Sequence, residues 1–260
     1  MSVLAVKVLL SPAFVVGASL AMRRFGPHVG GLLGSLPVVA GPILLVFALD
    51  HGRSFGAHAA TASVLGLVSL TAFVVVYGLL AGSHSWPVTL LAGWGGFLVA
   101  TAALSALDVG PVAALAVAFV SFFVGLAILR GTTALSEPPG APPSWDLPVR
   151  ALSAVVLVLA ITAAAGALGS QLSGLLAPFP VITSVLAAFT HIQGDAADVR
   201  RLLRGFLTGF FSFALFCFTV AVTIRSAGIA VAFLLALTVA VATQVSIFLL
   251  LRNRGTRLSA

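Results

Sequence analysis

The segment Gly174–Asp195, GLLAPFPVITSVLAAFTHIQGD, constrains the fold more than any other part of the chain. It is apolar enough to lie in a bilayer, yet Pro178 and Pro180 fall where a spanning helix would be midway across. Because proline removes a backbone donor and clashes with the preceding turn, we expect this helix to kink or break. Hydrocarbon cannot satisfy the backbone groups that a break frees, so they need partners from protein, water or a ligand.

The composition indicates an integral membrane protein. Of the 260 residues, 60% are hydrophobic and 7% charged, whereas about 25% of a soluble domain is charged. Apolar runs of about 20 residues, the length of a membrane span, predict an all-α polytopic transmembrane helical bundle of about nine spans. They cover roughly 3–22, 29–49, 57–81, 86–106, 110–130, 149–168, 171–193, 202–224 and 227–251.

The basic residues predict the orientation of these spans. With nine crossings, one side receives ten of the thirteen Lys and Arg residues, and the other receives Lys7, Arg53 and Arg225. Basic residues collect on the cytoplasmic side, so we expect the N-terminus outside and the C-terminus in the cytoplasm. The same rule explains the net charge of +7 without nucleic acid.

The chain also carries an internal repeat. Gly31–Gly52, GLLGSLPVVAGPILLVFALDHG, matches Gly174–Asp195 at a shift of 143 residues. The same shift pairs Gly66, Ser69 and Phe73 with Gly209, Ser212 and Phe216. Because five crossings separate the copies, they form two inverted four-span repeats with broken second helices, as in secondary transporters. This division assigns 1–109 to the first repeat, 110–130 to a connector span, 131–147 to a Pro/Gly-rich cytoplasmic linker, 148–251 to the second repeat and 252–260 to a basic tail.

Candidate binding residues lie at the two breaks and along the half-helices that follow them. The half-helix after Pro180 begins with its positive dipole end toward mid-membrane, and the hydroxyls of Thr183 and Ser184 lie in its first turn. The alternative is a kink whose free groups are satisfied by neighbouring helices. The substrate-binding candidates are Ser35, Pro37, Gly41, Asp50, Pro178, Pro180, Thr183, Ser184, Thr190, His191 and Arg204.

The ionisable candidates each have a structural alternative. His191 and Asp50 lie near span ends, where they form either a proton-accepting pair, one at each mouth, or hydrated helix caps. Asp195 and Asp198 suit the cap and first turn of the next helix. Arg204 lies deepest among the basic residues there and suits an anionic group, although orientation alone also explains it.

No motif indicates an enzyme, a metal site or a cofactor. The sequence has no Walker A loop, HExxH or GxSxG pattern, and its five histidines are scattered. The expected partners are therefore the lipid bilayer and a small-molecule substrate, with a homo-oligomer left open.

At the two repeated segments the chain resembles the GlpM-like group of small bacterial inner-membrane proteins. The likeness lies in GLLAPFPVITSVLAAFTHIQGD and the residues after it, and more loosely in Gly31–Gly52. It implies a fused, doubled unit located in the bacterial inner membrane, but no activity. The second segment has His191 where the first has Ala48, so the histidine is not repeated.

Three functions fit this sequence. The first is a transporter or permease for a small solute, with Pro37, Pro180, Thr183 and Ser184 lining a central cavity. The second is a non-transporting scaffold or envelope-assembly factor, which predicts a sealed core. The third is a flippase or enzyme for lipid-linked substrates, which needs a lateral opening beside Arg201 or Arg204.

Overall fold

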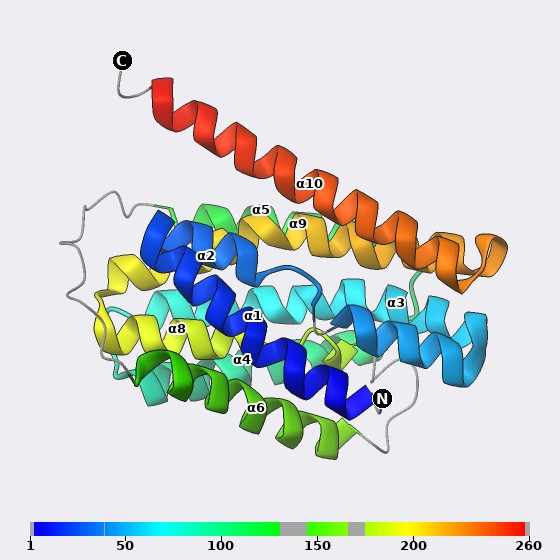
Figure 1. Ribbon diagram of the computed structural model, residues 1–260, viewed down its shortest axis with the longest axis horizontal. Coiled ribbons are helices and arrows are strands. Elements are labelled where there is room, and N and C mark those ends of the chain that lie inside the picture. Colours follow the sequence, from blue (N-terminus) through cyan, green and yellow to red (C-terminus); the bar gives the residue numbers. More distant parts are fainter. Residues whose placement is uncertain (1–2, 39, 131–144, 166–174, 258–260) are drawn as a thin grey trace.

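The computed structural model describes residues 3–38, 40–130, 145–165 and 175–257, and these fold into a bundle of roughly aligned helices (Figure 1). Throughout these described ranges the regular structure is helical. The helices are α1 (Val3–Phe25), α2 (Pro27–Gly34), α3 (Ala40–Leu80), α4 (Trp86–Ser105), α5 (Pro111–Ile128), α6 (Asp146–Ala165), α8 (Val181–Gln193), α9 (Ala196–Ala227) and α10 (Ile229–Arg257).

Glycine and proline set many of the helix boundaries. Pro27 and Pro111 occupy the first helical positions of α2 and α5, where a missing amide costs nothing. Gly52 and Gly228 have φ values of 88° and 86°, which glycine adopts without steric cost. At Gly52 the chain reverses within α3, so that Ala40–His51 and Arg53–Leu80 are two helices.

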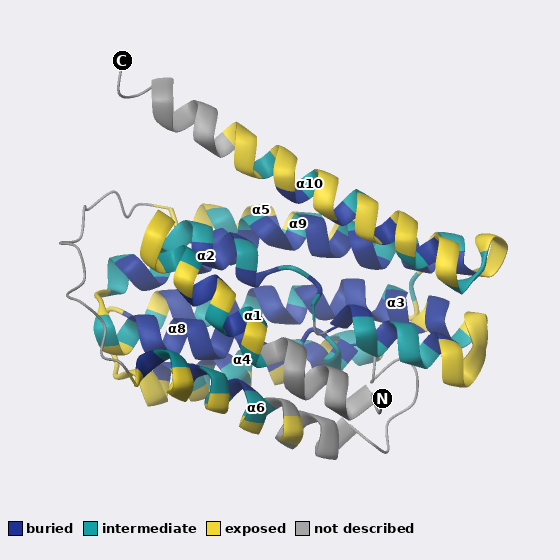
Figure 2. Cartoon of the chain, in the orientation of Figure 1, coloured by how far each residue is buried: buried dark blue, intermediate teal, exposed yellow. Residues whose placement is uncertain are grey.

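Five described helices are long and apolar enough to cross a membrane: α3, α4, α5, α9 and α10. In the most apolar part of α3 and α9, 67% and 61% of residues are buried, against 17% in α10. The peripheral helices carry many exposed residues (Figure 2). Among them are bulky apolar side chains on α5 such as Val120 and Phe123, each 62% exposed. Lipid can cover such a belt whereas water would penalise it, which indicates a membrane-embedded helical bundle with α3 and α9 at its centre.

Both segments predicted to be broken are interrupted in the structure. The first break separates α2 from α3, and the second precedes α8, after helical residues at Leu175 and Leu176. Both lie near the middle of the long axis of the bundle in Figure 1. The division into two four-span repeats stays a prediction.

The predicted linker 131–147 lies mostly outside the described residues. The last residues of this segment are described. Helix α6 begins at Asp146, and the Asp146 side chain is fully buried. The polar composition of the segment predicted a solvated residue here, but contacts with α1 and α8 bury it.

Candidate functional site

The two breaks have the same backbone hydrogen-bond pattern. In each, three amides donate to carbonyls at positions that match under the shift of 143 residues. The bonds of the first break are Leu36 N to Leu33 O (3.2 Å), Val38 N to Leu36 O (2.8 Å) and Gly41 N to Pro37 O (2.8 Å). Those of the second are Phe179 N to Leu176 O (2.9 Å), Val181 N to Phe179 O (2.7 Å) and Ser184 N to Pro180 O (2.8 Å).

Each break also packs against a long helix of the other half of the chain. A Cβ atom at Gly209 of α9 would overlap Ser35, and one at Gly66 of α3 would lie 2.5 Å from the carbonyl oxygen of Leu175 and 3.0 Å from Pro178. Gly66 and Ser35 match Gly209 and Pro178 under the same shift. The small residues therefore allow the same close contact twice, once for each half.

A cavity of about 40 Å³ lies between the two breaks. This is room for a small ion or for one or two waters. Four predicted site residues line it: Ser35, Pro178, Pro180 and Thr183. The rest of its wall is Gly34, Leu36, Ala40, Leu70, Ala177, Phe179, Val181, Ile182, Phe210 and Phe213.

Two predicted cavity residues, Pro37 and Ser184, are buried beside the cavity rather than in its wall. The Ser184 hydroxyl accepts a hydrogen bond of 3.0 Å from the indole Nε1 of Trp94, which ties α8 to α4. Gly41, which matches Ser184 under the shift of 143 residues, faces Phe216, whose ring would lie 3.4 Å from an added Cβ. These residues position the cavity wall.

The hydroxyls at the breaks differ in their partners. Ser35 Oγ donates to the carbonyl oxygen of Leu32 (2.6 Å), and the amide of Gln244 in α10 donates to the same oxygen. Thr183 is 3% exposed, and its hydroxyl has no hydrogen-bond partner among the described residues. It is therefore available to whatever occupies the cavity.

The remaining predicted site residues lie away from the cavity. Thr190 donates to the carbonyl oxygen of Leu186 at 2.7 Å. His191 is half-buried, with Nδ1 3.4 Å from the Tyr77 hydroxyl. Asp50 is exposed at the turn within α3, and Arg204 is half-buried on α9. The structure brings neither His191 nor Asp50 to the breaks.

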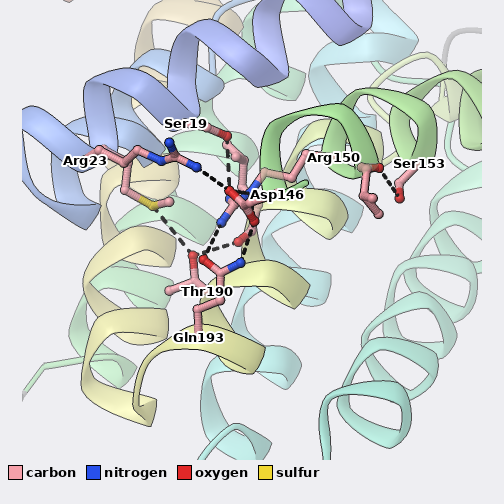
Figure 3. A network of polar contacts seen from close by, with 10 residues as sticks. Ser19, Arg23, Asp146, Arg150, Ser153, Thr190 and Gln193 are labelled. Carbon is pink, nitrogen blue, oxygen red and sulfur yellow. Dashed lines mark hydrogen bonds and ion pairs between the residues drawn. The ribbon is translucent and has the colours of Figure 1, made fainter. Parts of the chain in front are cut away.

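The structure contains a buried ionic network that the sequence did not indicate (Figure 3). It lies at one end of the bundle. Asp146 accepts from the Nε of Arg150 at 2.9 Å, from Arg23 at 2.6 Å and from the amide of Gln193. The guanidinium of Arg150 also bonds the Gln193 side-chain oxygen at 3.1 Å and lies 4.8 Å from the centre of the Phe189 ring. These contacts join α1, α6 and α8.

Asp146 is ionised in this setting. Its burial acts to raise the pKa, but hydrogen bonds from Gln193, Arg150 and Arg23 and the charge of Arg150 outweigh burial and lower the pKa below 3.8. The local signal was an Asp–Arg pair four residues apart at a helix start. The sequence could not show that α1 and α8 bury this pair.

The predicted cap of α9 is confirmed, because the Asp195 carboxylate accepts from the amide of Asp198 at 2.7 Å. Within the described ranges, no group of three or more His, Cys, Asp and Glu side chains could hold a metal ion. In comparisons with known proteins, no family model, curated protein or solved structure matches the chain.

Proposed function

We propose that the protein is an integral-membrane permease for a small solute, working by alternating access at its two broken helices. The observation that carries this proposal is the cavity between the breaks, which is lined by Ser35 and Thr183. Backbone freed inside a membrane protein is tolerated where it is packed in protein or lines a cavity. Discontinuous helices that meet at a cavity are typical of transporter binding sites.

The matched breaks support an inverted repeat as the basis of this mechanism. Their hydrogen bonds agree pair by pair, and each break packs on a glycine of the other half. Because the halves hold each other at the cavity, rocking one against the other would open it first to one side and then to the other. In this mechanism the cavity of about 40 Å³ is the solute site.

Contacts near the connections between helices support nine membrane crossings. At one end Arg23 pairs with Asp146, and Arg200 donates to the carbonyl oxygen of Gly78. At the other end Arg225 lies 3.4 Å from His58. Successive connections thus alternate between the ends, as nine spans require, and the arginine-rich end would be cytoplasmic. Together with the GlpM-like resemblance, this supports a bacterial inner-membrane location.

Thiol labelling tests alternating access directly. Cys217 is the single cysteine and is fully buried, so Cys217→Ala gives a clean background for Thr183→Cys. We expect membrane-impermeant thiol reagents to modify Thr183→Cys from either face of membrane vesicles. The matched control is Ala214→Cys, at a fully buried position of α9 outside the cavity wall, which should stay unmodified.

Two results would contradict the proposal. If Thr183→Cys reacts from both faces no faster than Ala214→Cys, the core is sealed, which favours the scaffold alternative. If proteoliposomes are no more permeable than empty liposomes to a panel of small neutral and charged solutes, the protein is not a permease.

A further inference from the structure

The half-helices that follow the two breaks both begin at the cavity. Ala40, the first residue of α3, lines it, and so do Val181, Ile182 and Thr183 in the first turn of α8. The first amides of a helix have no partner within it, and they carry the positive end of the helix dipole. Two positive helix ends therefore share one cavity of about 40 Å³.

A second feature of the cavity also calls for a ligand. The hydroxyl of Thr183 is in the cavity wall, and the residue is 3% exposed. Among the residues that the structure describes, this hydroxyl has no hydrogen-bond partner. A hydroxyl in the wall of a cavity can donate to an occupant, so an occupant that accepts its proton would be stabilised.

The surroundings favour an anion over a cation. Three carbonyl oxygens of wall residues already accept amide hydrogens: Leu36 O from Val38 N, Phe179 O from Val181 N, and Pro180 O from Ser184 N. No carboxylate lines the cavity. Neither kind of ion would meet a charged side chain of opposite sign, but an anion would meet amide and hydroxyl donors.

We infer that the cavity between the breaks binds a single small, largely dehydrated inorganic anion, held by the Thr183 hydroxyl and by the amides of Ala40, Ile182 and Thr183, since the amides of Gly41, Val181 and Ser184 already donate to carbonyls. This inference rests on the proposed permease function and names its substrate class. The volume of about 40 Å³ suits an anion about the size of a halide, and Phe179, Phe210 and Phe213 form part of the wall.

Halide efflux tests this inference. Purified protein is reconstituted into liposomes loaded with potassium chloride or potassium fluoride, and efflux is followed with ion-selective electrodes after valinomycin is added. We expect efflux well above that of empty liposomes, a drop of at least tenfold in Thr183→Val, and recovery in Thr183→Ser. The matched control is Thr101→Val, which makes the same substitution at a buried, unpartnered hydroxyl outside the cavity and should leave efflux unchanged.

The outcomes separate this inference from the proposed function. If urea or glycerol crosses but neither halide does, the anion inference is overturned and the permease stands. If no solute crosses, both are overturned. If the halides cross equally in wild type and Thr183→Val, this site is not the one that binds them.

Thermal unfolding in detergent gives a readout that does not depend on transport. A ligand that binds only the folded state raises the melting temperature. At constant ionic strength, chloride or fluoride should raise the melting temperature relative to gluconate, which is too large for the cavity. The increase should be lost in Thr183→Val and kept in Thr101→Val. Equal melting temperatures in halide and gluconate for the wild type would overturn the inference.

Discussion

Arg150 is the largest fully buried side chain among the described residues, at 1% exposure. A buried guanidinium is tolerated only with partners, and Arg150 has them in Asp146 and Gln193. Arg23 also pairs with Asp146, but its side chain is 31% exposed. Loss of Asp146 would therefore leave Arg150 buried without a countercharge, whereas loss of Arg23 would leave the Asp146–Arg150 pair in place.

Asp146→Ala should cost about 3–5 kcal/mol of stability, because it leaves the buried Arg150 without a countercharge. Arg23→Ala should cost about 1 kcal/mol or less, because water can replace this half-exposed partner. Chemical unfolding of the detergent-solubilised protein, followed by circular dichroism, measures both. Equal losses for the two variants would contradict the assignment of Asp146 as the centre of the network.

The same carboxylate predicts a pH dependence. Its folded-state pKa lies below the ordinary value of 3.8, so the unfolded state binds a proton first as the pH falls. The stabilisation is fully present above pH 3.8 and is lost as the pH falls through the folded pKa. The melting-temperature gap between wild type and Asp146→Asn should be constant near neutrality and shrink below pH 3.8. A gap that widens in acid would contradict this prediction.

At the scale of elements, close helix packing holds the first break in place. Helices α2 and α9 lie so close together that a Cβ added at Gly31, Gly205 or Gly209 would overlap the facing helix or the residues that follow it. The spacing of Gly205 and Gly209 is the small-xxx-small pattern, which predicts helix packing. Here the packing carries a second consequence, because Gly209 meets Ser35 in the cavity wall.

Gly209→Ala should destabilise the protein by about 1–3 kcal/mol, the usual cost of overpacking, because Ser35 must move. Gly95→Ala is the matched control: Gly95 is exposed on α4, and nothing lies within 4 Å of its added Cβ. It should be neutral or gain up to about 1 kcal/mol from helix propensity. Unfolding curves of the two variants measure the difference, and similar stabilities would contradict the close contact between α9 and the first break.

How far the sequence predicts these elements depends on whether the signal is local. Pro37 and Pro180 mark the breaks because proline acts on its own helix, and Asp195 marks a cap for a similar reason. The shift that pairs Gly66 with Gly209 also pairs Leu70 with Phe213, and both line the cavity. The Trp94–Ser184 bond and the burial of Asp146 depend on helices far apart in the chain, which no local pattern reports.

At the scale of the whole molecule, the ends of the bundle differ in charge. At one end, Arg23 contacts Asp146, and Arg200 contacts the carbonyl oxygen of Gly78. At the other end, Arg53 lies within 4 Å of a Cβ added at Gly228. Basic residues stay in the cytoplasm during insertion, so the first end should be cytoplasmic. The turn within α3 and the connection between α3 and α4 should then lie on opposite sides of the membrane.

Single cysteines at Ser54 and Ser83 test this orientation, since both residues are exposed and flank the same helix, Arg53–Leu80. In the Cys217→Ala background and in intact cells, Ser54→Cys should react with an impermeant maleimide added outside, because it lies at the outer end. Ser83→Cys should react only after the cells are lysed. Reaction of both from outside would contradict the membrane crossing between them, and the reverse pattern would contradict the predicted orientation.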